Sequence, residues 1–427
     1  MMKRTLGCWV AAAAVVVGSL SVSVPAGAEG GLTLEERLER LERKGEGPAG
    51  CCDTSELQRR LDQIEAHIKN LPFGIKLGGG IATSYQYNFN DPDSNLTSLR
   101  AFDRDHNSFV LDLFQLQVSR APGEDGVGFM TKIDFGKLAE RLGTDWDGDG
   151  TAGNVAEEQN SIEIQEAYIT YNFPGLPDLQ VKAGKFATPI GAEVIEPWAN
   201  PNISRSNQFA WGIPYIHTGA TASYAFGSQA SLMLGIVNGW DNAVDSNDGK
   251  SVLASVAITP VEQFSLLLNG IYGAEQPDRG DSKRGLFDVV ATIKPVENFA
   301  IILNYDYGNE SDLGVGGDAE WNAFSGIVSY DIVEGLPMPI GFAFRGEVFD
   351  DSDGTRLPTL GGAGFGSFQS AAEVTGTFKV VLAEGLMFRT EYRYDWGNNA
   401  LYENYPTAGD NSQDDQHTIA AQLSYVF

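Results

Sequence analysis

From residue 73 onward, apolar and polar residues alternate with a period of two, in segments of about ten residues. Between residues 386 and 396, Leu386, Phe388 and Tyr392 share one face, whereas Arg389 and Glu391 share the other. One such strand would also suit a soluble sandwich, but many of them separated by turn residues are typical of a transmembrane β-barrel. Because every backbone group in lipid needs a partner, such a sheet must close on itself. The pattern therefore predicts an all-β fold, a transmembrane antiparallel β-barrel over residues 73–427.

The segments can be counted. We expect sixteen strands, and bacterial single-chain barrels have an even number. Their predicted spans are 73–90, 107–120, 125–136, 162–174, 178–188, 217–227, 229–240, 250–260, 262–274, 284–295, 297–309, 319–332, 338–350, 366–380, 386–398 and 415–427. Short turns alternate with long connections at 91–106, 137–161, 189–216, 241–249, 275–283, 310–318, 351–365 and 399–414. A barrel of this size encloses a water-filled channel.

Two N-terminal segments precede the barrel. Residues 1–28 read as a secretory signal peptide, with Lys3 and Arg4 before an apolar run and a small-residue cleavage site at 26–28. Residues 29–72 carry apolar residues at coiled-coil spacing and predict a periplasmic helical segment, which would pair with copies of itself in a homo-oligomer or with a partner. The alternative is a single amphipathic helix at the barrel mouth. Cys51 and Cys52 lie in the break between its two helical stretches, and a cross-link between chains is one role for them.

The last predicted strand carries a second targeting signal. Ile419, Leu423, Tyr425 and the terminal Phe427 fall on one face. This arrangement resembles the terminal strand signal of bacterial outer-membrane proteins, which the barrel-assembly machinery reads. We therefore expect a location in the outer membrane of a Gram-negative bacterium, among lipid and lipopolysaccharide.

Composition and missing motifs argue against other functional classes of protein. The 427 residues include 29 Lys+Arg against 57 Asp+Glu, a net charge of −28, which argues against a nucleic-acid partner. The four histidines accompany no G-x-S-x-G motif, so we expect no enzyme. There is no C-x-x-C-H motif for covalent haem, although a barrel that sheathes a partner, such as an electron-conduit cytochrome, stays open as an alternative.

The longest connection, 189–216, is rich in Trp, Phe and Pro, with Glu193, Glu196 and Arg205 among them. We expect it to fold into the lumen, where charged side chains sort ions by sign. The alternative is that Arg205 and the glutamates only pair with each other and brace the loop. Further candidates for the constriction lie on the inward faces of predicted strands: Lys182, Arg345, Glu347, Arg389, Glu391 and Arg393.

The same region carries a family resemblance. The stretches 184–197, 200–206, 214–219 and 237–250, with Asn238-Gly239-Trp240-Asp241 in the last, are similar to the OmpL-like β-barrel porin family. That resemblance covers about residues 73–427 and implies passive diffusion of small hydrophilic solutes, without naming the solute. The helical segment resembles the coiled-coil leaders of some phosphate-selective porins. The lumen, however, carries both signs, for instance Arg393 beside Glu373, so the residues do not predict phosphate selectivity.

One further motif concerns a metal. Asp145, Asp147 and Asp149, followed by Gly150, match the opening of a Ca²⁺-binding loop. Glu157 stands one residue later than the usual last ligand. An acidic exposed loop explains the run nearly as well, so Ca²⁺ on an outer loop is an open expectation, and we expect no other cofactor.

Overall fold

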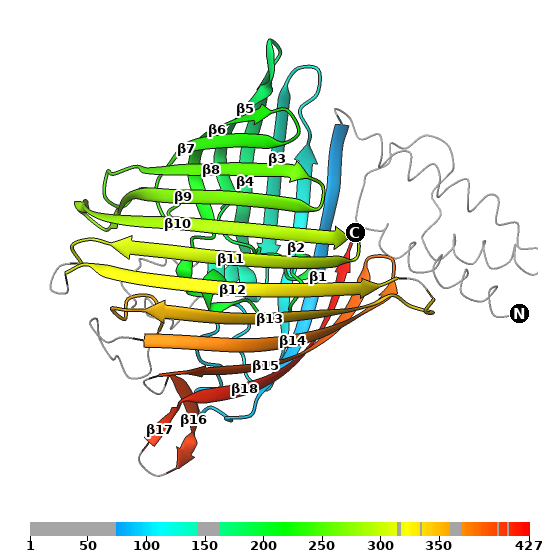
Figure 1. Cartoon of the computed structure of the whole chain (residues 1–427), viewed down its shortest axis with the longest axis vertical. Helices are drawn as coiled ribbons and strands as arrows, with labels where there is room; N and C mark the ends of the chain where they lie inside the picture. The colour runs from blue at the N-terminus through cyan, green and yellow to red at the C-terminus, as the bar shows by residue number, and fades with distance from the viewer. Residues whose placement is uncertain are drawn as a thin grey trace, which may run out of the picture. The chain divides into compact units, whose positions relative to one another are not determined.

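The computed structural model describes residues 74–143, 162–313, 317–333, 335–358, 369–398, 401–407 and 410–427. Within these ranges sixteen strands close into an antiparallel barrel (Figure 1). The strands are β1 (Ile75–Asn88), β2 (Ser108–Arg120), β3 (Val127–Phe135), β4 (Ile162–Phe173), β5 (Leu176–Ala187), β6 (Ile216–Phe226), β7 (Ala230–Val237), β8 (Ser251–Val261), β9 (Phe264–Gln276), β10 (Arg279–Val296), β11 (Phe299–Glu310), β12 (Ala319–Ile332), β13 (Ile340–Asp351), β14 (Gln369–Ala383), β15 (Leu386–Gly397) and β18 (Asp415–Val426). The predicted fold class and strand number are confirmed.

Closure joins the two ends of the barrel sequence. β1 pairs with β18 in the register Gly80↔Val426 to Asn88↔Thr418. The terminal residue takes part, because the Phe427 amide donates to the Gly79 carbonyl at 3.0 Å and the Gly79 amide donates back at 3.2 Å. The backbone groups of both terminal strands are therefore paired, as a sheet in lipid requires.

Three connections differ from the prediction. β9 and β10 continue past the expected ends, so 275–283 is a hairpin with Asp278 at φ +57 rather than a loop. The expected connection 399–414 contains a second hairpin, β16 (Tyr402–Thr407) with β17 (Asp410–Gln413). The expected connection 137–161 begins with the helix α4 (Lys137–Gly143). In each case polar and turn-forming residues predict a loop, whereas strand pairing or burial stabilises a regular element there.

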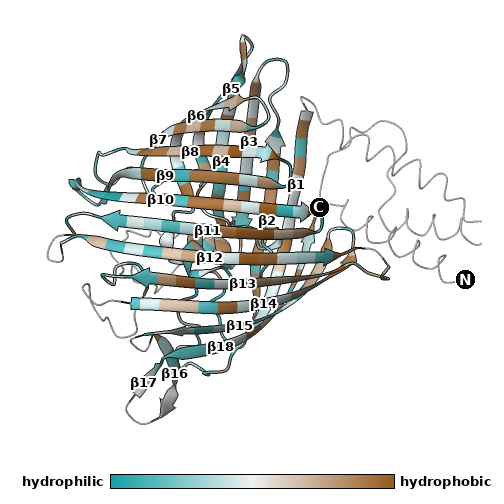
Figure 2. Cartoon of the chain, in the orientation of Figure 1, coloured by the Kyte–Doolittle hydropathy of each residue, from teal (hydrophilic) through white to brown (hydrophobic). Residues whose placement is uncertain are grey.

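The two faces of the strands meet different surroundings. On β13, Phe344 and Val348 are 62 % and 53 % exposed, whereas Arg345 and Glu347 between them are 2 % and 4 % exposed. Figure 2 shows brown apolar residues recurring along the strands of the barrel wall. An apolar outer wall suits lipid, and the polar groups lie on the inner side. Among the described residues, no helix is long and apolar enough to cross a membrane.

The buried apolar core lies inside the barrel, between the wall and its connections. Loop L1 (89–107, between β1 and β2) and loop L3 (188–215, between β5 and β6) supply much of it. The rings of Phe102 and Phe209 stand 5.5 Å apart, and those of Phe102 and Tyr215 5.2 Å. The Trp211 indole N–H donates to the Leu99 carbonyl at 3.1 Å. The two loops are thus packed against each other on the lumen side.

Several expectations fall outside the described residues. These are the signal peptide 1–28, the helical segment 29–72 with Cys51 and Cys52, and the acidic run from Asp145 to Glu157. They stay as predictions.

Candidate functional site

Loop L3 leaves the wall at β5 and returns to it at β6, but its main partners lie across the barrel. Seven strands separate β6 from β14 in either direction round the sheet, so β14 lies opposite the origin of the loop. L3 contains two short helical turns, η2 (Pro197–Ala199) and η3 (Gln208–Gly212). Its hydrogen bonds to β13 and β15, described next, carry it across the lumen.

Two carboxylates of the opposite wall bind the backbone of L3. Glu391 on β15 accepts the amides of Ile203 and Ser204 at 2.6 and 2.9 Å. Glu347 on β13 accepts the amide of Asn207 at 2.8 Å and that of Gln208. Both carboxylates are 4 % exposed. Charge-assisted bonds of this kind are roughly twice as strong as neutral ones, so the wall fixes two points of the loop.

Two arginines of β15 bind the carbonyl groups of the same loop. Arg389 donates to the carbonyls of Asn200 and Pro197 at 2.7 and 2.9 Å. Arg393 donates to the Arg205 carbonyl at 2.6 Å. Each guanidinium offers several donors in one plane, which suits adjacent backbone carbonyls. Arg389 and Arg393 therefore hold the path of the loop rather than standing free in the lumen.

Arg345 joins the wall and the loop through side chains. It pairs with Glu193 of L3 at 2.8 Å and with Glu373 of β14 at 2.5 Å. It also donates to the Ser204 carbonyl at 2.7 Å. The side chains of Arg345 and Glu373 are fully buried. This group is a buried ion network that includes one member from the loop.

Arg205 lies inside the fold of L3. It is 4 % exposed and donates to the carbonyls of Val194, Ile195 and Ile203 at 3.0, 2.6 and 2.8 Å. Burial lowers the pKa of its guanidinium below the ordinary value. Arg205 therefore braces the loop through its carbonyl groups. Among the described residues it forms no ion pair with Glu193 or Glu196, which pair with Arg345 and Lys132 instead.

Glu196 takes a different position, toward β2, β3 and β4. It forms an ion pair with Lys132 of β3 at 2.6 Å, and Lys132 also pairs with Glu166 of β4 at 2.7 Å. Gln165 donates to Glu196 at 3.0 Å. Burial acts to raise the pKa of Glu196, but Lys132 and the hydrogen bonds outweigh it and lower the pKa below its ordinary value of 4.5. This cluster anchors the near side of L3.

Lys182 on β5 faces the lumen, opposite Thr221 of β6 and Thr170 of β4. Its ammonium stands 4.7 Å from the centre of the Tyr168 ring and 5.1 Å from that of Phe186. None of the ion pairs in the described part of the chain includes Lys182. Its ammonium therefore lies against aromatic rings rather than an ion-pair partner, and the Glu166 carboxylate acts on it without forming an ion pair.

Several residues at the site were not singled out from the sequence. Lys132 and Glu166 sit on strands, where the alternation marks them as inward but not as partners of L3. Arg100 of L1 pairs with Asp395 at 3.1 Å, and Arg356 donates to the Trp211 carbonyl at 2.8 Å. Arg100 and Arg356 lie in long connections, where a lone arginine carries no positional signal.

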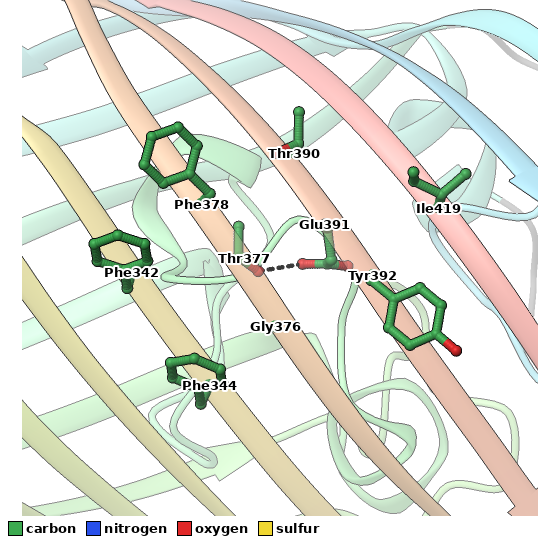
Figure 3. Close-up of a pocket in the computed structure, with 9 residues that line it drawn as sticks. All are labelled: Phe342, Phe344, Gly376, Thr377, Phe378, Thr390, Glu391, Tyr392 and Ile419. Carbon is green, nitrogen blue, oxygen red and sulfur yellow. Dashed lines mark hydrogen bonds between the residues drawn. The ribbon is translucent and has the colours of Figure 1, made fainter.

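The wall also has a depression of about 290 Å³ on its outer side, beside Gly376 (Figure 3). The aromatic side chains around it face outward, while the Thr377–Glu391 hydrogen bond of 2.7 Å lies on the inner side. The depression therefore belongs to the lipid-facing surface and not to the solute path. Its aromatic lining is Phe342, Phe344, Phe378 and Tyr392.

Comparisons with known proteins agree with this geometry. Solved structures with the same fold include the outer membrane channel DcaP of Acinetobacter baumannii, at 15 % identity and a TM-score of 0.54, with 83 % of this chain and 97 % of that one covered. An anion-selective porin from Comamonas acidovorans shares 12 % identity at a TM-score of 0.53, with 83 % and 99 % covered. OprB of Pseudomonas putida shares 11 % at 0.53, with 86 % and 97 % covered. No curated protein sequence matches this chain.

The family itself is shown by the sequence. The family described as "Putative beta-barrel porin-2, OmpL-like" matches residues 74–427, which contain all sixteen strands of the barrel. The closed sixteen-strand sheet, its apolar outer wall and the loop held across its lumen all fit that match. The chain therefore belongs to the OmpL-like β-barrel porin family, and it is a passive-diffusion channel of the Gram-negative outer membrane.

Proposed function

We propose that L3 is the constriction of this channel, and that it limits passage to small hydrophilic solutes and ions. The observation that carries the proposal is the set of buried bonds from Glu347, Glu391, Arg389 and Arg393 to the backbone of L3. A loop tied to the wall opposite its origin narrows the lumen at one level. Because its backbone groups are fixed, the opening keeps a constant shape.

The ion selectivity of the channel depends on the lumen side chains whose charge no ion-pair partner neutralises. Glu193 and Arg345 neutralise each other, and Glu196 pairs with Lys132. The Lys182 ammonium lies over the Tyr168 and Phe186 rings and forms no ion pair among the described residues. We infer that Lys182 contributes more to the field in the open part of the lumen than Arg205 does, and that it favours anions locally.

A barrel that sheathes a partner protein is the second candidate. Such a partner would need the space that L1 and L3 occupy with the packed rings of Phe102, Phe209 and Tyr215. These contacts favour the channel. The expected assembly through residues 29–72, and the recognition of Phe427 by the assembly machinery, remain proposals from the sequence.

The test is electrical. The purified full-length protein in a planar bilayer should give discrete conductance steps, and the reversal potential under a salt gradient reports ion selectivity. Lys182→Gln should move the reversal potential toward cation preference, because it removes an uncompensated positive charge. Lys250→Gln, which alters an exposed loop lysine paired with Asp245, is the matched control and should leave the potential unchanged.

Two results would contradict this account. Absence of conductance steps, together with co-purification of a multihaem cytochrome, would favour the sheath. Equal reversal potentials for the wild type and Lys182→Gln would remove the selectivity role of Lys182.

A further inference from the structure

Two carboxylates on the inner faces of β10 and β11 face each other, next to Gln208 of L3. Asp288 on β10 and Asp306 on β11 are directly paired in the sheet register, and both are fully buried. Directly opposed side chains have Cβ atoms about 4.5–5.5 Å apart, and like charges in that position destabilise a sheet. The pair therefore needs a compensating positive charge or a proton.

The side chains around the pair supply only neutral donors. Asn269 and Asn304 each donate to Asp288 at 2.6 Å, and Gln208 of L3 donates to Asp306 at 2.9 Å. The ion pairs within the described residues include neither Asp288 nor Asp306. An ionised carboxylate buried without a cation is strongly unfavourable, so the described residues leave this charge uncompensated.

Three oxygen atoms beside the pair lack a hydrogen-bond partner among the described residues. They are Asp306 Oδ1, Gln208 Oε1 and Asn269 Oδ1. Gln208 and Asn269 are 1 % and 2 % exposed, and the nitrogen atom of each amide lies against one of the two carboxylates. A proton shared by the carboxylates would leave both amide oxygens unsatisfied. A metal cation beside the carboxylates can accept a lone pair from each oxygen that lies within about 2.3–2.6 Å of it.

We propose that Asp288, Asp306, Gln208 and Asn269 bind a Ca²⁺ ion inside the barrel. Ca²⁺ takes six to eight oxygen ligands, among them carboxylates, side-chain amide oxygens and water, in flexible geometry. Its two charges match those of the two carboxylates. The described residues contain no group of three or more His, Cys, Asp or Glu side chains that could hold a metal, so this site depends on amide oxygens and water for its remaining ligands.

The position of Gln208 gives the ion a mechanical role. Gln208 begins the helical turn η3 of L3, whereas the other three ligands belong to β9, β10 and β11. An ion at this point ties the loop to a third stretch of wall, apart from β13–β15. The binding stands independently of the proposed constriction, whereas any effect of Ca²⁺ on conductance rests on it.

The experiment counts bound ions on the full-length protein in detergent. The protein is stripped with EGTA and dialysed against ⁴⁵Ca²⁺, first as wild type and then as Asp288→Asn and Asp306→Asn. Each variant should bind one Ca²⁺ fewer per chain than the wild type. Ions bound elsewhere, for example at the acidic run from Asp145 to Asp149, cancel in the difference.

The controls separate a lost site from a lost fold. Asp112→Asn changes another buried lumen carboxylate, which already has Ser84 and Gln422 as donors, and it should bind as much Ca²⁺ as the wild type. Gln208→Leu lies outside the strands and should raise the Ca²⁺ concentration needed for half saturation. If the folded Asp288→Asn and Asp306→Asn bind as many ions as the wild type, the proposal is overturned. If either strand variant does not fold, an unchanged half-saturation concentration in Gln208→Leu overturns it.

Discussion

Arg345 joins the wall to L3 through a single buried side chain. Replacement by Met keeps much of the volume but removes the guanidinium that pairs with Glu193 at 2.8 Å and with Glu373 at 2.5 Å. It also removes the bond to the Ser204 carbonyl at 2.7 Å. Glu193 and Glu373 keep only weaker partners, among them the Ser206 amide at 2.9 Å and Arg393 at 3.9 Å.

The expected magnitude follows from burial. The side chains of Arg345 and Glu373 are fully buried and that of Glu193 is 4 % exposed. Removing one member of a buried ion pair destabilises by about 3–5 kcal/mol, because the partner is left without compensation. Each 1.4 kcal/mol is tenfold, so the ratio of docked to undocked L3 should fall by roughly 100- to 4,000-fold. Adding Glu193→Gln to Arg345→Met should recover part of the lost stability, since it removes one of the two carboxylates that Arg345→Met leaves without its cation.

Single-channel recording gives the readout. We expect Arg345→Met to show larger or noisier conductance steps than the wild type. Arg279→Met, which breaks an exposed pair with Asp312 and should change stability by about 1 kcal/mol or less, is the control and should conduct as the wild type does. Wild-type conductance and noise in a folded Arg345→Met would refute the reasoning that this network holds the loop.

Two further predictions concern other contacts. Because Lys132 lowers the pKa of Glu196 below its ordinary value of 4.5, their pair stabilises the folded state fully above pH 4.5 and loses this effect as the pH falls through the lower pKa of the folded state. The conductance of the wild type should therefore change as the pH is lowered below 4.5, whereas that of Glu196→Gln should not, and equal pH responses would contradict this. An added Cβ at Gly308 would lie 1.9 Å from the buried Trp321 ring, so Gly308→Ala should destabilise the barrel by about 1–3 kcal/mol in thermal unfolding. Gly175 has open space around it, so Gly175→Ala is the control and should not destabilise the barrel. Equal melting temperatures for the two variants would show that the Trp321 ring moves aside.

Much of the barrel could be predicted because alternation is a local signal. Arg389, Glu391 and Arg393 were assigned to the inner face from their spacing alone, and the paired register places them there. The strand ends agree within a few residues for most strands. The hairpin at Pro277 and Asp278 cannot be told from a loop in the sequence, because turn residues inside a continuing strand pair follow the same pattern.

The contacts of each charged side chain in the lumen could not be predicted from the sequence of its own strand. Glu391 binds amides 188 and 187 residues away in sequence, and Arg345 binds Glu193 152 residues away. Those partners are set by the number of strands, the register at closure and the path of L3, none of which a two-residue period contains. For this reason the sequence leaves open whether Arg205 and the glutamates face solvent or brace the loop, and it gives no sign that each of them has a different partner.

By itself, then, the sequence determined which elements form, which of their faces meets lipid, and that the longest loop turns inward, since each follows from residues that are neighbours in the chain. Only the tertiary structure decided that Glu347 and Glu391 bind the backbone of that loop, that Lys182 lies against the Tyr168 ring, and that Asp288 and Asp306 meet. The physical reason is that burial and compensation of a charge depend on what lies across the lumen, and closure of the sheet sets that arrangement.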